Sequence, residues 1–224
     1  MNSSPTNSLS RKLQLYVFLT VLFSLIIAAA NLTGRKIVAF YILNQEISIS
    51  VALLFFPISF LISDLITEFF GKEYAYFTVK LAVLTNVLLA LFLIPLNLLP
   101  ANSWSPIDDK IFSAIFGVFD KAVLASLISV YISQVLDIYV FSYIKQNVSN
   151  LLWLRSFVST ILGQITDTAI VGFLYCLFNL MPCDKVTTVG VGNFLIKFLA
   201  TTASIPILYS GKYFMNRFIY KAKD

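Results

Sequence analysis

The sequence predicts an all-α membrane protein with about six transmembrane helices and both termini in the cytoplasm. Hydrophobic residues make up 58% of the 224 residues, charged residues make up only 12%, and the mean hydropathy is +0.86. A soluble domain carries roughly 25% charged and about 45–50% apolar residues. So few charges cannot cover the surface of a water-soluble globule. We therefore expect lipid to cover most of the surface of this chain.

Besides its composition and low charge, the chain contains six apolar runs, each near the ~20 residues that a membrane-spanning helix needs. We predict spans at Leu13–Leu32, Ser50–Phe69, Tyr74–Leu99, Lys121–Tyr143, Leu152–Met181 and Asn193–Phe214. Pro57 and Pro206 lie inside two of these runs, and prolines are tolerated in membrane helices, where they often mark kinks. The first run follows two cations as a signal peptide would, but it is longer than the usual ~7–15-residue signal core. We therefore interpret it as an uncleaved span.

The spans divide the chain into three parts. Residues 1–12 form a cytoplasmic N-terminal tail, residues 13–214 the six-helix membrane domain, and residues 215–224 a basic cytoplasmic C-terminal tail. With the N-terminus inside, the inner segments hold more Lys and Arg than the outer ones, as the positive-inside rule requires. The +5 net charge therefore fits membrane topology, and we expect no nucleic-acid partner. In the outer segment 34–49, period-two alternation after Asn44–Gln45 predicts a small hairpin.

Cysteine and histidine content limits the chemistry. The chain has two cysteines, Cys176 and Cys183, and no histidine. Because there is no CxxC motif, the sequence does not support a metal site or a disulfide framework, and we expect no cofactor. Without histidine, any proton transfer has to use carboxylates, Lys or Tyr.

Two spans carry the same polar motif. Gln134 and Asp137 lie in the fourth span, and Gln164 and Asp167 lie in the fifth. Residues at i and i+3 share a helix face, so each Gln-x-x-Asp pair points in one direction. Both glutamines lie roughly 16 Å from the inner surface at 1.5 Å per residue, near the midplane. Because buried carboxylates are costly and often mark transport pathways, we predict that the two pairs face each other across a shared polar cavity.

Other polar groups extend this set. Asp64 and Glu68 form an i, i+4 carboxylate pair nearer the cytoplasmic end of the second span, where a proton could be carried. Asn31 ends the first span, and Arg35 and Lys36 follow it. Lys197 lies inside the sixth span, where we expect it to be the counter-ion of a membrane aspartate. For each residue the alternative is structural: helix–helix hydrogen bonding, a solvated helix end, or interfacial snorkelling.

Carboxylate and amide side chains together suit a flat heterocycle. A carboxylate accepts two hydrogen bonds side by side, and a primary amide offers both a donor and an acceptor. That pattern complements the edge of a guanine-like base, and aromatic rings could stack on its face. Amines, sugars and cations would suit carboxylates as well, so this chemistry permits a purine-like ligand without singling one out.

The segment from Phe56 to Lys72 is similar to the "FP-T-F-x-x-D-x-x-x-E-x-x-G-K" stretch of the queuosine precursor transporters, a family also described as of the vitamin-uptake-transporter type. Asn31, Lys36, residues 133–141 and residues 153–168 fit the same pattern, so the resemblance covers nearly the whole chain. It implies six membrane helices and uptake of a 7-deazaguanine: preQ0, preQ1 or queuine.

By this resemblance, ligand binding is carried over to Gln134, Asp137, Gln164 and Asp167, with Asn31 and Lys36 in support and Asp64 and Glu68 as candidates for proton coupling. One position departs from the family. Ser204 stands where an acidic residue is expected before Pro206 in the last span. The pocket therefore has one carboxylate fewer than expected, which leaves the choice of precursor open.

Three alternative functions are compatible with a polytopic membrane chain. An intramembrane aspartyl protease would use Asp137 and Asp167, but the Tyr-Asp and Gly-x-Gly-Asp motifs of such enzymes are not present. A substrate-binding subunit of an energy-coupling-factor ABC-type vitamin importer is the main rival. The chain lacks a GxxxxGK[ST] loop, so its ATP would have to come from a partner. A purely structural membrane protein would not need matched polar pairs.

The sequence therefore predicts a transporter rather than an enzyme. We expect it to be a multi-pass protein of the cell inner membrane that contacts lipid and moves a small molecule by alternating access around a midplane site. Association into a homo-oligomer is compatible with such a chain.

Overall fold

The computed structural model describes residues 5–34, 36–42, 45–117, 121–148 and 150–220. Its elements follow in chain order: α1 (Pro5–Thr33), β1 (Ile37–Ile42), β2 (Gln45–Ser50), the 3-10 helix η1 (Val51–Leu54), α2 (Phe56–Phe69), α3 (Lys72–Leu96), α4 (Asp109–Phe116), α5 (Lys121–Asn147), α6 (Leu152–Leu177) and α7 (Cys183–Tyr220). Six helical segments among these residues are long and apolar enough to cross a membrane, which confirms the predicted all-α membrane fold. Many large apolar side chains point outward, among them Phe18, Phe92, Phe173 and Leu199.

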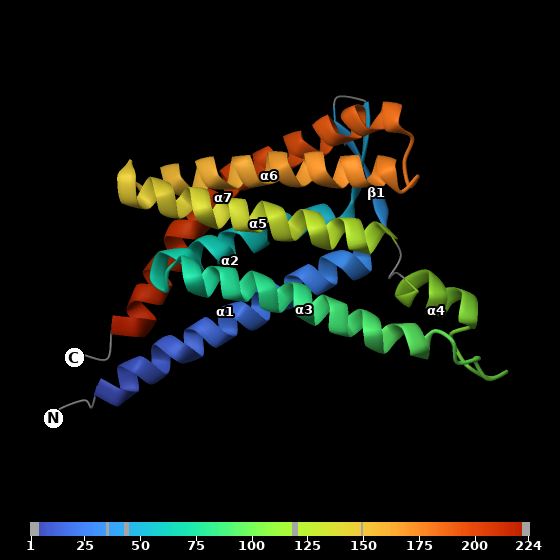
Figure 1. Cartoon of the computed structure of the whole chain (residues 1–224), viewed down its shortest axis with the longest axis horizontal. Coiled ribbons are helices and arrows are strands. Elements are labelled where there is room, and N and C mark those ends of the chain that lie inside the picture. The colour runs from blue at the N-terminus through green and yellow to red at the C-terminus, as the bar shows by residue number, and fades with distance from the viewer. Residues whose placement is uncertain (1–4, 35, 43–44, 118–120, 149, 221–224) are drawn as a thin grey trace.

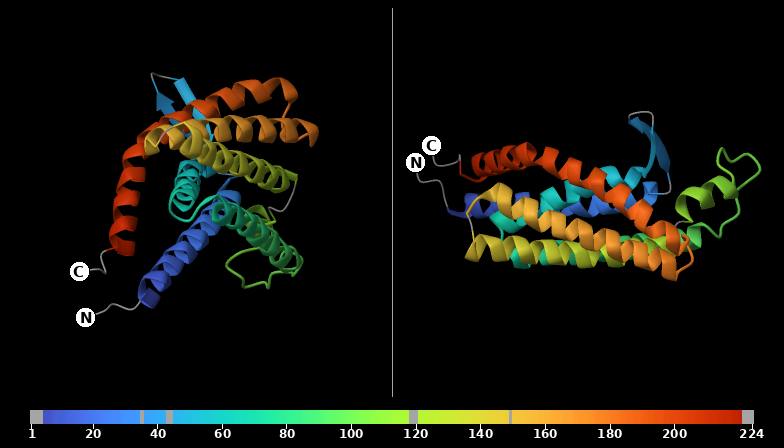
Figure 2. Two further views of the ribbon diagram at one scale, coloured as in Figure 1. Left: turned by 60° about the vertical axis from the view of Figure 1, so that its left-hand side comes forward. Right: turned by 90° about the horizontal axis from the view of Figure 1, so that it is seen from above.

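The helices form one bundle with a hairpin at one end. Both termini lie at the same end, and the β1–β2 hairpin and α4 lie at the other (Figure 1, Figure 2). We call the end with the termini the terminal end and the opposite end the hairpin end. The most extensive helix–helix packing is between α5 and α6 and between α6 and α7. The apolar core includes Phe23, Ile66, Ile138 and Phe141.

The predicted hairpin is confirmed. β1 and β2 pair antiparallel, from Ile37 opposite Ser50 to Ile42 opposite Gln45. Ser50 is the N-cap of η1: its hydroxyl accepts a hydrogen bond from the Ala52 amide at the start of that helix. Residues 43–44 and Arg35 lie outside the described residues.

The ends of several helices differ from the ends of the predicted spans. The second span is divided into η1 and α2, and Pro57 lies in the first turn of α2, where its missing N–H costs no hydrogen bond. Gly71 has φ of 95°, a left-handed conformation that suits glycine, and it joins α2 to α3 in a tight turn. The last helix is longer than predicted, starting at Cys183, and it bends in both figures with Pro206 inside it.

The two cysteines form a disulfide, so the expectation that no disulfide is supported was wrong. Cys176 lies near the end of α6 and Cys183 is the first residue of α7, with their Cα atoms 5.0 Å apart. The spacing rule failed because the chain reverses between two helices here. This reversal brings residues seven apart into contact.

Close packing of α5 on α6 depends on Gly163. A Cβ added there would lie 2.8 Å from Cε1 of Phe60 and 3.2 Å from the Ser133 carbonyl oxygen. We expect Gly163→Ala to lower the free energy of unfolding by about 1–3 kcal/mol, because the helices must move apart. Gly192→Ala in α7 is the matched control, since a Cβ there meets nothing within 4 Å. Thermal unfolding of the two purified variants in detergent tests this, and equal melting temperatures would contradict it.

Candidate functional site

A cavity of about 290 Å³ lies among α1, the hairpin, η1, α2, α5, α6 and α7. Its lining includes residues beside the hairpin, such as Gly34 and Ile37, and residues where α6 ends, such as Tyr175, which place it toward the hairpin end. Small-molecule sites are concave and mostly apolar, with a few convergent polar groups, and have volumes of about 300 Å³ or more. The polar and charged residues lining this cavity are Asn31, Ser50, Ser126, Asp167, Tyr175, Asn193 and Lys197.

A buried ion pair contributes to this cavity. Lys197 Nζ of α7 lies 2.7 Å from Asp167 Oδ2 of α6, and the two side chains are 4% and 3% exposed. Ser129 of α5 donates a 2.6 Å hydrogen bond to Asp167 Oδ1. The Lys197 ammonium also lies 4.5 Å from the ring centroid of Phe56, which lines the cavity from α2. The expectation that Lys197 is the counter-ion of a membrane aspartate is confirmed.

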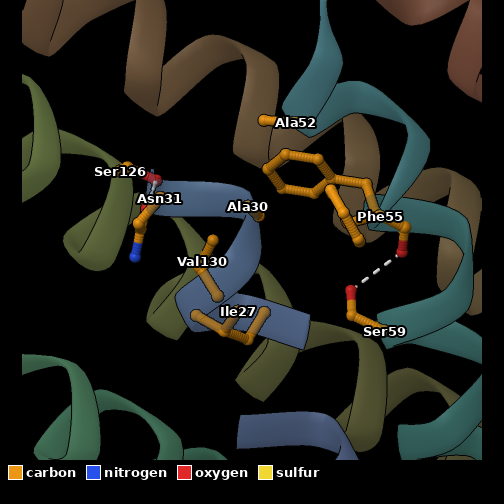
Figure 3. A pocket seen from close by; sticks show the side chains of 9 residues that line it. Ile27, Ala30, Asn31, Ala52, Phe55, Ser59, Ser126 and Val130 are labelled. Carbon is orange, nitrogen blue, oxygen red and sulfur yellow. Dashed lines mark hydrogen bonds between the residues drawn. The ribbon is translucent and has the colours of Figure 1, made fainter. Parts of the chain in front are cut away.

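A smaller pocket of about 20 Å³ adjoins the cavity. The two share Asn31, Ala52, Phe56 and Ser126, among other lining residues. In Figure 3 the pocket lies between α1, the start of α2 and α5, and Ser59 lines it while donating a hydrogen bond to the Phe56 carbonyl. Space of this size holds about one water molecule. The small pocket therefore extends the hollow space from the cavity as far as Ser59.

Asn31 lines both spaces and is firmly held. Its amide nitrogen donates to Asn86 Oδ1 of α3 at 2.9 Å, and its oxygen accepts from Ser126 of α5 at 3.0 Å. Asn31 therefore links three helices as well as facing the cavity. The side chain of Lys36 is exposed, and its neighbours Gly34 and Ile37 line the cavity, so Lys36 lies near the rim.

The two glutamines lie behind the cavity wall. Gln134 and Gln164 are fully buried, and neither lines the cavity. Gln134 Nε2 donates to Ser59 Oγ of α2 at 3.3 Å, and Gln164 Nε2 donates to Thr201 Oγ1 of α7 at 2.6 Å. Each side chain thus connects its helix to a different neighbour.

The two aspartates occupy different levels, so the structure differs from the predicted shared pocket. Asp167 contacts Ser129 of α5, whereas Asp137 interacts with Ser159 of α6. Ser129 and Asp137 are eight residues apart on one helix, about 12 Å along its axis. The reason is helix direction: in antiparallel helices the same Gln-x-x-Asp motif places its aspartate on opposite sides of the glutamine level. Asp167 therefore lies toward the hairpin end and Asp137 toward the terminal end.

Asp137 belongs to a second polar group with Asp64 of α2. Ser63 donates a 3.3 Å hydrogen bond to Asp137, and Ser156 of α6 donates one to Asp64. Asp64 lies within electrostatic range of Asp137, and both side chains are at most 1% exposed. The structure thus pairs Asp64 with Asp137, whereas the sequence paired it with Glu68.

Glu68, near the end of α2, is surrounded by three cations. Arg155 of α6 lies 2.6 Å from Oε1, Lys212 of α7 lies 2.9 Å from the same atom, and Lys145 of α5 lies 2.8 Å from Oε2. We call these four residues the Glu68 cluster. It joins four helices at the terminal end of the bundle, and Arg155, 3% exposed, also covers the Phe141 ring.

Sequence reasoning missed the partners of Glu68. Lys145, Arg155 and Lys212 lie near the inner ends of three predicted spans, and nothing in their spacing connects them to Glu68. Phe56, Tyr175 and Asn193 of the cavity were not singled out either. The one available signal was that Arg155 lies within the first turn of a predicted span, where a cation can reach the protein interior.

The family described as "putative vitamin uptake transporter" matches residues 50–211. The chain belongs to this family. The match runs from Ser50 through most of α7 and includes Asp167 and Lys197, together with Glu68, Lys145 and Arg155 of the Glu68 cluster.

One curated relative of this transporter family is the "Probable queuosine precursor transporter" of Bacillus subtilis (strain 168). It is 33% identical over 158 residues, which cover 68% of this chain and 67% of the relative. No solved structure matches. Membership of a transporter family, together with six apolar helices, makes the protein a multi-pass membrane transporter and not an enzyme. The aspartyl protease alternative is therefore set aside, and the ABC-subunit alternative is not favoured.

Proposed function

We propose that the protein imports a queuosine precursor, a 7-deazaguanine, through the cell inner membrane. The observation that carries this is the cavity with a buried carboxylate–ammonium pair in a chain related to a queuosine precursor transporter. In this proposal both termini are cytoplasmic and the hairpin end faces outward, so the cavity is open to the incoming substrate.

The ion pair suits the edge of a 7-deazaguanine. The ring N1–H and the exocyclic amine of such a base can donate to the two oxygens of Asp167, and Lys197 can donate to the ring carbonyl oxygen. Phe56 offers a flat apolar face for stacking. From the predicted binding set, we propose that Asp167 and Asn31 contact the base and that Lys36 stands at the rim. Gln134 and Gln164 position Ser59 and Thr201 behind the wall.

Alternating access gives the remaining elements a role. Substrate bound at the cavity has to pass between α2, α5, α6 and α7, and the Glu68 cluster joins these helices at the cytoplasmic end. We propose that this cluster closes the inner side while the cavity is open outward. Its separation would then release the base to the cytoplasm.

The test is uptake-dependent modification of tRNA. The chain is expressed in cells that lack both queuosine synthesis and their own importer but keep the enzymes that convert each precursor. preQ0, preQ1 or queuine is supplied at low concentration, and queuosine is measured in tRNA. We expect at least one precursor to restore queuosine. No restoration by any of the three, with the protein present in the membrane, would contradict the proposal.

A further inference from the structure

Asp64 and Asp137 form a buried pair of like charges deep between α2, α5 and α6. Their side chains are 1% and 0% exposed, and each carboxylate acts electrostatically on the other. Oδ2 of Asp64 accepts a hydrogen bond from the Ser156 hydroxyl, and Oδ2 of Asp137 accepts one from the Ser63 hydroxyl. The Oδ1 atom of each aspartate is buried with no hydrogen-bond partner among the described residues. Two buried carboxylates of like charge, each with an unpartnered oxygen, indicate that this pair needs a proton or a positive charge.

The surrounding cations are mostly engaged elsewhere. Arg155 acts on Asp64 but lies in contact with Glu68, and Lys145 and Lys212 also contact Glu68. Around Asp137 the neighbouring polar groups are hydroxyls, from Ser63 and from Ser159 and Thr160 of α6. A buried carboxylate without a cation is strongly unfavourable, and one proton shared by the two groups removes one of their two negative charges.

Polar side chains about one helical turn from this pair reach the small pocket. Ser59, which lines the small pocket, accepts a hydrogen bond from Gln134, and Gln134 precedes Asp137 by three residues on α5. Ser63, one turn after Ser59 on α2, donates to Asp137. The Oε1 atom of Gln134 is also buried without a partner. Buried ionisable groups that face the interior of a membrane bundle are typical of proton pathways in membrane proteins.

We propose that Asp64 and Asp137 together carry one proton that crosses the membrane with each substrate molecule. The proton enters from the outer side, is held by one of the two carboxyls during the change of access, and leaves on the cytoplasmic side. Glu68 is not the carrier, because three cations within 2.9 Å hold it in its charged form. This inference rests on the proposed import function.

The experiment separates substrate movement from coupling. Purified full-length protein is reconstituted into liposomes, and radiolabelled preQ0, preQ1 and queuine are used in turn. Counterflow, the exchange of external label for internal unlabelled base at equal pH, needs binding and alternating access but no net proton movement. Accumulation driven by an acidic exterior needs the proton as well. Asp64→Asn and Asp137→Asn are measured in both assays, with Glu73→Gln, an exposed carboxylate of α3, as the matched control.

We expect the native protein and Glu73→Gln to perform both reactions. The two Asn variants should keep counterflow within about threefold and lose pH-driven accumulation by tenfold or more. Counterflow also shows that each variant is folded. Accumulation retained in both Asn variants, counterflow lost in both, or accumulation driven by a sodium gradient and not by pH would each overturn the inference. Native counterflow without any pH dependence would overturn it and leave import standing. No native counterflow with any of the three bases would overturn both.

Discussion

Glu68→Gln is expected to lower the free energy of unfolding by about 3–5 kcal/mol, the cost of breaking a buried ion pair by removing one partner. The change leaves three cations, from α5, α6 and α7, close together with no carboxylate between them. The unpaired charge of Arg155 contributes most to this loss of stability, because its side chain is 3% exposed and cannot reach water. For a protein of this size the melting temperature should fall by roughly 6–20 °C.

Thermal unfolding in detergent and membrane abundance measure this effect. Glu73→Gln is the matched control, because it removes an exposed carboxylate from the same end of the bundle and should change stability by less than about 0.5 kcal/mol. Adding Arg155→Met to Glu68→Gln removes the buried charge as well, so the double variant should be more stable than the sum of the two single effects predicts. A melting temperature for Glu68→Gln equal to that of the control would show that the cluster contributes nothing.

Asp167→Asn is expected to reduce uptake at least about 100-fold, because two hydrogen bonds to a charged acceptor are lost from the proposed base contact. The amide cannot accept from Ser129 and the base as a carboxylate does, and Lys197 is left buried without its counter-ion. Uptake of labelled precursor into proteoliposomes is the measurement. Asp184→Asn is the control, since that residue is exposed in the first turn of α7, also at the hairpin end.

A second variant separates binding from folding. Asp167→Asn combined with Lys197→Met removes both charges, so the buried site is neutral again and membrane abundance should recover. Uptake should stay low, because the donor and acceptor for the base edge are still missing. If Asp167→Asn alone transports within threefold of the native rate, Asp167 is a structural residue and the base binds elsewhere.

The helices and the hairpin were predictable because they depend on local properties. Apolar runs of the right length identify spans whatever their neighbours are, and alternation at residues 45–50 identifies a strand. The pairing of Lys197 with a membrane aspartate was also predictable, because a cation buried in a span needs a nearby anion. Burial of the Gln134 and Gln164 side chains is consistent with the midplane placement that the sequence suggested.

The grouping of polar residues could not be predicted so well. The repeated Gln-x-x-Asp motif suggested one site, but reversal of chain direction between α5 and α6 assigns its aspartates to different levels. Likewise, Glu68 meets Lys145, Arg155 and Lys212 only after four helices pack together, and no spacing in the sequence records that contact. Sequence patterns identified the chemical groups, and bundle geometry determined their neighbours.

The disulfide limits which parts of the protein can move. Cys176 and Cys183 tie α6 to α7 at the hairpin end, and Gly172 of α6 lies so near Val186 of α7 that an added Cβ would be 2.6 Å from it. At the terminal end, ion pairs to Glu68 connect the same two helices. Helices α6 and α7 are therefore covalently fixed to each other at the hairpin end, whereas at the terminal end they are connected only by ion pairs, which can separate. In the proposed alternating-access cycle, closure of the cavity would therefore require movement of α1, the hairpin and α2, while α6 and α7 would separate only at their terminal ends.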